Sequence, residues 1–117
     1  MTALPIVDDP QHVAWVYERA VALLDEDGWC QGAVEQDGKR CAVGALREVE
    51  FGWPAGPSDD DRQDDEPTEA DDAALIEPLA SYLEDVPENW NDRQGRQYAE
   101  VRAALLGVAS HYRGGGR

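Results

Sequence analysis

Basic residues and long apolar runs are scarce in this chain of 117 residues. Ten Lys and Arg stand against 25 Asp and Glu, which gives a formal net charge of −15 at pH 7. Because a phosphate-binding protein needs a basic face, we expect no direct binding to nucleic acid or to an anionic membrane. No stretch approaches the ~20 apolar residues of a membrane span. Residues 1–10 lack the basic segment and the apolar run of a secretory signal, so we expect a cytoplasmic protein.

Cysteine is equally scarce, since Cys30 and Cys41 are the only two. Two cysteines exclude a disulfide framework, and in a reducing cytoplasm both thiols are expected to be free. Their spacing does not match a redox Cys-x-x-Cys motif. A four-ligand zinc site would need both histidines, His12 and His111, as its remaining ligands. We predict no metal site and no cofactor; whether the two thiols touch is left open by the sequence.

Cys41 has a second interpretation, because it stands where a helix is predicted to begin. Backbone N–H groups at such a position lower the pKa of a thiol and favour a nucleophilic thiolate. With His12 or His111 as the base, the protein would be a small cysteine-dependent enzyme. The flanking Ala42 and Val43 favour a buried core thiol instead. The enzyme is therefore the alternative hypothesis, and a noncatalytic protein is the first.

What the chain does contain is apolar residues at helical spacing. Asp9 and Pro10 suit the N-cap and first position of a helix, and Gly28 suits its end. Asp37 and Gly38 favour a two-residue hairpin turn. We predict a mainly α fold, a single helical domain over residues 1–117 with four or five helices and a short β-hairpin around residues 31–41.

Two local features of the second half bear on this prediction. Pro78 either kinks one helix or separates two, and the sequence leaves this open. Asn91 or Asp92 is predicted to cap the last helix.

The predicted core consists of Val16, Tyr17, Ala20, Leu24, Trp29, Cys41, Leu46, Leu79, Leu83, Trp90, Val101, Leu105 and Val108.

The strongest compositional bias lies in an acidic segment, residues 58–72, where nine acids accompany the single Arg62. A run of like charge with few apolar residues cannot bury enough surface to order itself, so we expect a mobile loop over about residues 56–68. Its acids do not fit a calcium loop, because the sixth and twelfth positions counted from Asp59 are Asp64 and Ala70. The predicted partner-binding residues are these acids and one tryptophan: Asp59, Asp60, Asp61, Asp64, Asp65, Glu66, Glu69, Asp71, Asp72 and Trp90.

Three motifs give the chain a family resemblance. They are GWCQG at residues 28–32, RCAVGAL at residues 40–46, and Trp90-Asn91-Asp92 followed by Arg96 and Glu100-Val101. This pattern resembles a family of small proteins of unknown function from high-GC actinobacteria and their bacteriophages. The resemblance covers most of the chain and implies no established activity. The acidic segment departs from the pattern, so the resemblance implies nothing about that segment.

The charge and the resemblance together suggest a function. We expect a noncatalytic acidic binding or inhibitor protein, encoded by an actinobacterium or by a phage that infects one, that masks a basic surface on a protein partner. Carboxylates spread over a folded surface would then imitate the phosphates of a nucleic acid. The sequence identifies neither the partner nor the oligomeric state.

Overall fold

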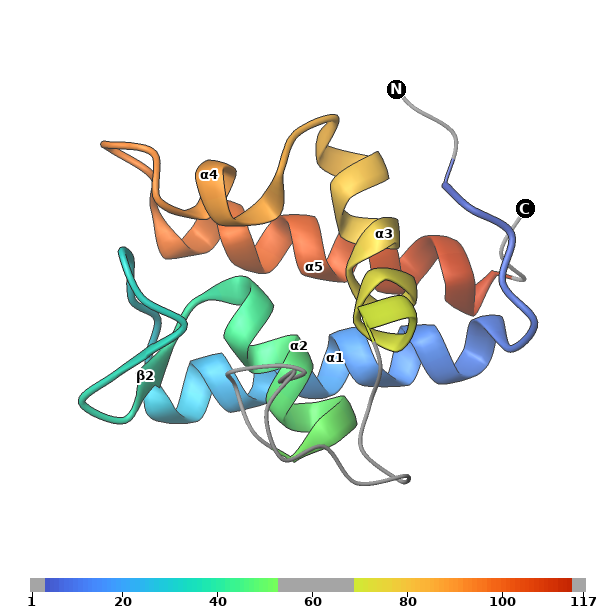
Figure 1. Ribbon diagram of the computed structural model, residues 1–117, viewed down its shortest axis with the longest axis horizontal. Coiled ribbons are helices and arrows are strands. Elements are labelled where there is room, and N and C mark those ends of the chain that lie inside the picture. The colour runs from blue at the N-terminus through green and yellow to red at the C-terminus, as the bar shows by residue number, and fades with distance from the viewer. Residues whose placement is uncertain (1–3, 53–68, 115–117) are drawn as a thin grey trace.

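A computed structural model describes residues 4–52 and 69–114 of the chain. Within these residues the fold is mainly helical, as predicted, with five helices and one two-stranded hairpin (Figure 1). The elements in chain order are α1 (Pro10–Asp27), β1 (Glu35–Gln36), β2 (Lys39–Arg40), α2 (Ala42–Phe51), α3 (Glu69–Leu83), α4 (Pro87–Asn91) and α5 (Tyr98–Arg113).

The ends of α1 follow the predicted signals. The side chain of Asp9 accepts a hydrogen bond from the backbone N–H of His12, and Pro10 takes the first helical position. Gly28 ends the helix with a φ of +104°, and its N–H donates to the carbonyl of Leu24. These local rules were sufficient to place this helix.

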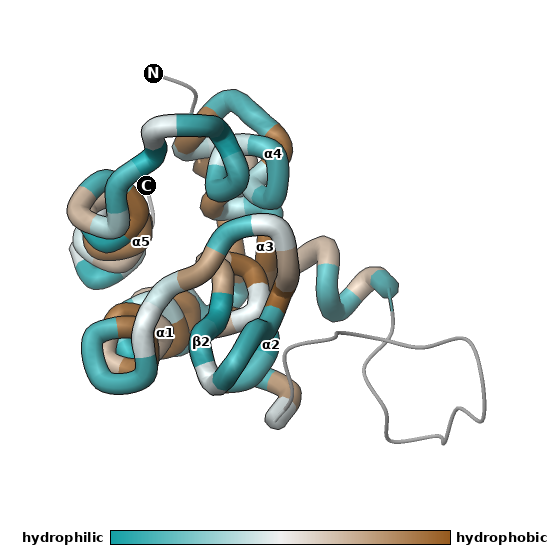
Figure 2. Tube along the Cα trace, turned by 90° about the vertical axis from the view of Figure 1, so that its left-hand side faces the viewer, coloured by the Kyte–Doolittle hydropathy of each residue, from teal (hydrophilic) through white to brown (hydrophobic). Residues whose placement is uncertain are grey.

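The most extensive contact between two elements is that of α1 with α5, and the two helices run antiparallel (Figure 1). At one end Tyr98 donates to Asp25, and at the other Arg113 pairs with Glu18. Hydrophobic residues recur along both helices at the spacing that turns them toward one another (Figure 2). The core lies between these helices, α2 and α3.

Pro78 lies inside one continuous helix, α3. Tyr17 of α1 braces this helix, since its hydroxyl donates to the carbonyl of Leu75 at 2.8 Å and accepts from the N–H of Leu79 at 3.2 Å. In an undisturbed α-helix these two backbone groups would bond to each other. Burial raises the pKa of Tyr17, so its hydroxyl remains a donor.

The prediction that Asn91 or Asp92 caps the last helix is wrong. Asn91 ends a separate short helix, α4, which Pro87 opens, and Asp92 is its C-cap. The N-cap of α5 is Gln97, which forms a capping box with Glu100. A five-residue helix has too few positions to show an apolar period, which is why the sequence pattern did not reveal α4.

Ten of the thirteen predicted core residues are buried. The other three, Trp29, Leu83 and Trp90, are half-buried and pack against the core from its edge. The acidic loop predicted for about residues 56–68 lies outside the described residues.

Candidate functional site

The three sequence motifs meet at one buried side chain, that of Asn91. Asn91 is 0% exposed. Its Oδ1 accepts from the indole Nε1 of Trp29 at 2.7 Å and from the backbone N of Ala42 at 3.1 Å. Its Nδ2 donates to the carbonyl of Cys30 at 3.1 Å. The amide therefore joins Trp29 and Cys30 of the first motif and Ala42 of the second to α4, and we call this cluster the Asn91 joint.

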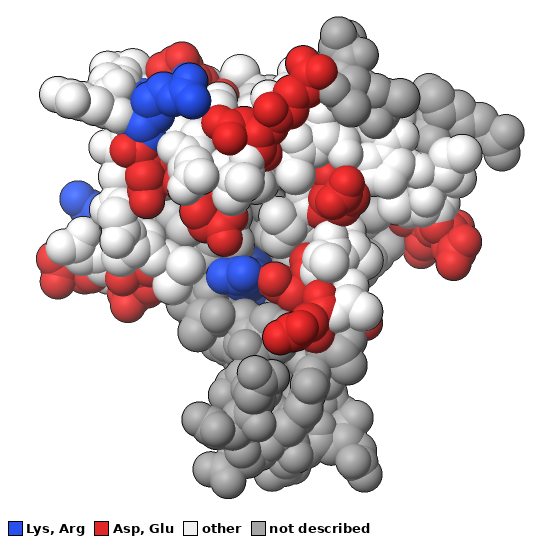
Figure 3. All heavy atoms as spheres, turned by 45° about the horizontal axis from the view of Figure 1, so that its top comes forward, with Lys and Arg blue, Asp and Glu red and all other residues white. Residues whose placement is uncertain are grey.

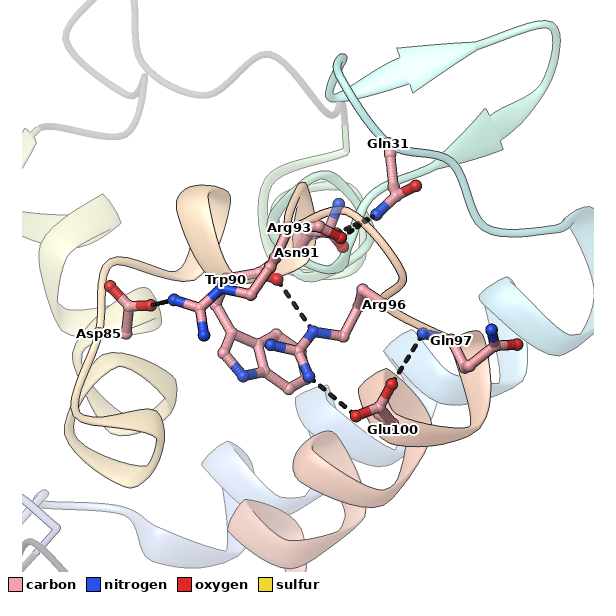
Figure 4. Close-up of polar contacts among 8 residues, drawn as sticks. All are labelled: Gln31, Asp85, Trp90, Asn91, Arg93, Arg96, Gln97 and Glu100. Atoms are coloured by element: carbon pink, nitrogen blue, oxygen red, sulfur yellow. Dashed lines mark hydrogen bonds and ion pairs between the residues drawn. The ribbon is translucent and has the colours of Figure 1, made fainter.

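Neighbouring polar groups extend the Asn91 joint to the surface. The Oδ1 of Asp92 accepts from Asn91 Nδ2 and from the backbone N of Gly32, both at 2.9 Å. Gln31 donates through Nε2 to the carbonyls of Asn91 and Arg93, and Figure 4 shows its side chain reaching across to α4. The loop before the hairpin is thus fastened to α4 through hydrogen bonds to side chains and backbone alike.

The hairpin also fixes the start of α2. Asp37 and Gly38 both have positive φ, as expected for the predicted two-residue turn. The N–H of Cys41 donates to the carbonyl of Val34 at 3.2 Å. Gly44 lies against that same carbonyl so closely that a Cβ atom there would overlap it. Glycine at position 44 is therefore a packing requirement rather than a flexible point.

Cys41 is the N-cap of α2, but its thiol is buried, with only 3% of the residue exposed. Its Sγ accepts from the N–H of Gly44 at 3.3 Å. Burial raises the pKa of Cys41 more than this N–H lowers it, so the neutral thiol is favoured. Cys30 is also free and buried, and burial together with Asp92 raises its pKa.

Neither candidate base is brought to Cys41. His12 lies beside Glu50, with its Nε2 3.0 Å from each carboxylate oxygen, near the opposite end of α2. A ten-residue helix is about 15 Å long, which is beyond hydrogen-bond reach. The ring of His111 packs edge-on against Tyr112 in α5. The geometry thus gives a buried structural thiol in place of a nucleophile with an adjacent base.

Trp90 is covered on one face by Arg96. The guanidinium carbon lies 3.9 Å from the centre of the indole ring, and Nε donates to the carbonyl of Trp90 at 3.1 Å (Figure 4). A second nitrogen of Arg96 pairs with Glu100 at 2.9 Å, and the Arg96 side chain is only 11% exposed. This arrangement holds the loop between α4 and α5 in place and leaves Trp90 half-buried.

Carboxylates outnumber basic side chains on the described face that Figure 3 shows. Figure 3 shows Asp and Glu spread over the face that carries the upper elements of Figure 1, with few Lys and Arg among them. Several arginines are already engaged in ion pairs within the chain. They are Arg40 with Asp27 and Glu48, Arg47 with Asp72, Arg93 with Asp85, Arg96 with Glu100, Arg102 with Asp25, and Arg113 with Glu18.

The predicted partner-binding acids divide into three groups. Glu69 and Asp71 are exposed in the first turn of α3. Asp72 forms a two-point contact with Arg47, at 2.8 and 2.9 Å, and its side chain is 19% exposed. The remaining six, Asp59, Asp60, Asp61, Asp64, Asp65 and Glu66, lie outside the described residues.

A model of a family of unknown function, DUF6197, matches residues 8–111. The chain belongs to DUF6197. No curated protein and no solved structure matches the chain. The resemblance to a family of unknown function is thereby confirmed, whereas its actinobacterial and phage setting and the three-motif pattern stay predictions.

The DUF6197 match covers the described helices α1 to α4, all but the last two residues of α5, and the whole Asn91 joint. None of the described helices is long and apolar enough to cross a bilayer. Sequence reasoning missed the central role of Asn91, because an asparagine beside a predicted helix start is read as an exposed cap. In the sequence the three motifs are separate stretches, and no local pattern indicates that they meet.

Proposed function

We propose that this DUF6197 chain is a noncatalytic binding protein that masks a basic surface on a protein partner. The observation that carries the proposal is the excess of carboxylates, 25 against ten Lys and Arg, in a chain whose arginines are largely paired internally. The acids that exceed these pairs give the surface a strong negative potential. Such a potential steers a basic partner toward the protein and repels nucleic acid.

The proposed contact is the acidic segment together with the helix end beside it. Glu69 and Asp71 project from the first turn of α3, where acids also favour the helix dipole. Asp72 is part of the proposed contact as well. A cation of the partner would have to displace Arg47 in order to pair with Asp72. Trp90 is a secondary contact, since Arg96 already covers one face of its ring.

The interior supports a binding role over catalysis. The polar groups of the Asn91 joint are bonded to one another, and Cys41 is a buried thiol with a raised pKa. The cysteine-enzyme alternative would need an exposed thiolate and a base beside it. The hydrogen bonds of the Asn91 joint instead fasten the loop before the hairpin to α4.

The biological setting is part of the same proposal and rests on the resemblance. We propose a cytoplasmic protein of an actinobacterium or of a phage that infects one, acting as an inhibitor of a host component. A nucleic-acid-binding host protein is the favoured partner class, because carboxylates presented on a folded surface would imitate the phosphates in its basic groove.

The experiment is capture from an actinobacterial lysate on the immobilised full chain, with parallel elution by salt and by competitor DNA. We expect one basic protein to be retained in about 50 mM salt and released by about 500 mM salt, because the Debye length falls from over 10 Å to a few Å. Competitor DNA should release the same protein. A partner whose retention is indifferent to both eluents, or no specific partner, would contradict the proposal.

A further inference from the structure

A hollow of about 430 Å³ lies between α1, α2 and α3, at the C-terminal end of α2. This volume is within the range of about 300–1,000 Å³ that is typical of small-molecule sites. The hollow is separate from the Asn91 joint, which lies at the other end of α2. None of the predicted functions uses the hollow itself, although Asp71, one of its lining residues, also belongs to the proposed partner contact.

The floor of the hollow is apolar. Val13, Val16 and Leu75 line it, together with Phe51 from the end of α2. Tyr17 also lines it, but the Tyr17 hydroxyl is already bonded to the backbone of α3. The floor therefore offers an apolar surface to a ligand. The hydroxyl of Tyr17 needs no further hydrogen-bond partner from the ligand.

The polar residues that line the hollow are acidic, apart from one imidazole. They are Asp9, Glu50 and Asp71, with His12 beside Glu50 at 3.0 Å. Among the described residues, neither Lys nor Arg lines it. Each carboxylate oxygen of Glu50 has lone pairs beyond the one that meets His12, so Glu50 can accept from a further donor.

We propose that this hollow binds a small organic cation, a protonated amine carried on a short apolar body. The body would lie on Val13, Val16, Phe51 and Leu75, while the ammonium group would lie near Glu50 at the rim. Carboxylates above low-dielectric walls attract a cation more strongly than carboxylates in open water, and they repel an anion of the same shape. This inference concerns a different ligand from the proposed protein partner and depends on Glu50, which is not part of the proposed partner contact; the two proposals share Asp71.

The test is a titration of the ¹⁵N-labelled full chain followed by NMR. The probe is hexylamine, which is protonated at neutral pH, and hexanol and hexanoate are the neutral and anionic controls of equal chain length. We expect saturable shifts of the backbone amides around Val13, Glu50 and Leu75 with hexylamine. Hexanol should bind at the same place more weakly, and hexanoate should bind weakest.

Three variants locate the binding. Glu50→Gln should weaken hexylamine binding about three- to tenfold and leave hexanol nearly unchanged, because it removes one charge at the rim. Ala74→Leu, on the exposed side of α3, should fill the hollow and weaken both ligands. Glu26→Gln is the matched control, since it removes one exposed charge near the other end of α1 and should change binding less than about twofold.

Several results would overturn the inference. They are equal binding of hexanoate, shifts that map outside the hollow, equal effects of Glu50→Gln and Glu26→Gln, and unchanged binding in a folded Ala74→Leu variant. If Ala74→Leu fails to fold, the comparison of Glu50→Gln with Glu26→Gln still decides the outcome.

Discussion

Replacing Asn91 by alanine should be among the most damaging single changes in the chain. The variant leaves the N–H of Ala42 and the carbonyl of Cys30 buried without partners, and it removes the acceptor of the Trp29 indole. Each unsatisfied buried group costs about 1–3 kcal/mol. We therefore expect the free energy of unfolding to fall by about 3–5 kcal/mol. A chain of this length has a total of roughly 6–18 kcal/mol.

The assay is urea unfolding followed by tryptophan fluorescence and circular dichroism. With an m-value of about 2 kcal/mol/M, Asn91→Ala should lower the urea midpoint by roughly 2 M. Asn89→Ala is the matched control, since Asn89 is exposed two residues earlier in the same short helix. Its effect should stay within about 0.5 kcal/mol. Equal and small effects of the two changes would refute the role assigned to Asn91.

An aspartate at position 91 tests the same reasoning through pH. Asn91→Asp keeps an acceptor but loses the Nδ2 donor, and at neutral pH it puts a charge in a buried site beside Asp92. Burial raises the pKa of the new carboxyl in the folded state above its unfolded value near 4, so the folded state binds more protons. The deficit in stability should shrink as the pH falls from about 8 to about 5, because the protonated acid can donate to Cys30. A deficit that is constant or grows on acidification would contradict this.

Two further substitutions and one labelling experiment test other contacts. Gly44→Ala should lower the free energy of unfolding by about 2 kcal/mol or more in the same urea assay, because its Cβ would overlap the carbonyl of Val34; a neutral effect would contradict the close approach. Cys41 should react with iodoacetamide at least about tenfold more slowly in the folded protein than in urea, by mass spectrometry, and fast labelling of the folded protein would favour the enzyme alternative. Tyr98→Phe should cost less than about 1 kcal/mol at neutral pH, because the pair is exposed. Hydrogen bonding from Tyr98 lowers the pKa of Asp25, so this stabilisation is present above the unfolded pKa of Asp25 and is lost as the pH falls through the lowered value. A difference between Tyr98→Phe and the natural chain that grows as the pH falls below the unfolded pKa of Asp25 would contradict that sign.

Local signals predicted much of the fold. Asp9 and Gly28 bound α1 because a cap and a glycine stop depend on neighbouring residues alone. The turn at Asp37 and Gly38 is equally local. Continuity of α3 through Pro78 was not predictable, because it depends on the hydroxyl of Tyr17, 61 residues earlier in the chain.

The candidate site was less accessible to sequence reasoning. The motifs were visible, yet the hydrogen bonds of Asn91 to Trp29 and Ala42 span 62 and 49 residues, which no local pattern encodes. The pairing of Asp72 with Arg47 is likewise a tertiary contact. The hollow beside Glu50 is assembled from three helices, and its acidic residues look from the sequence like ordinary solvated charges.

The most direct test of partner masking compares two variants of equal net charge. One carries Asp59→Asn, Asp60→Asn and Asp61→Asn, and the other carries Asp8→Asn, Glu26→Gln and Glu88→Gln, at three exposed positions outside the acidic segment. With the captured basic partner at fixed salt, masking by the acidic segment predicts at least about tenfold weaker binding for the first variant and less than about threefold for the second. Equal weakening of the two, or none in either, would contradict the account.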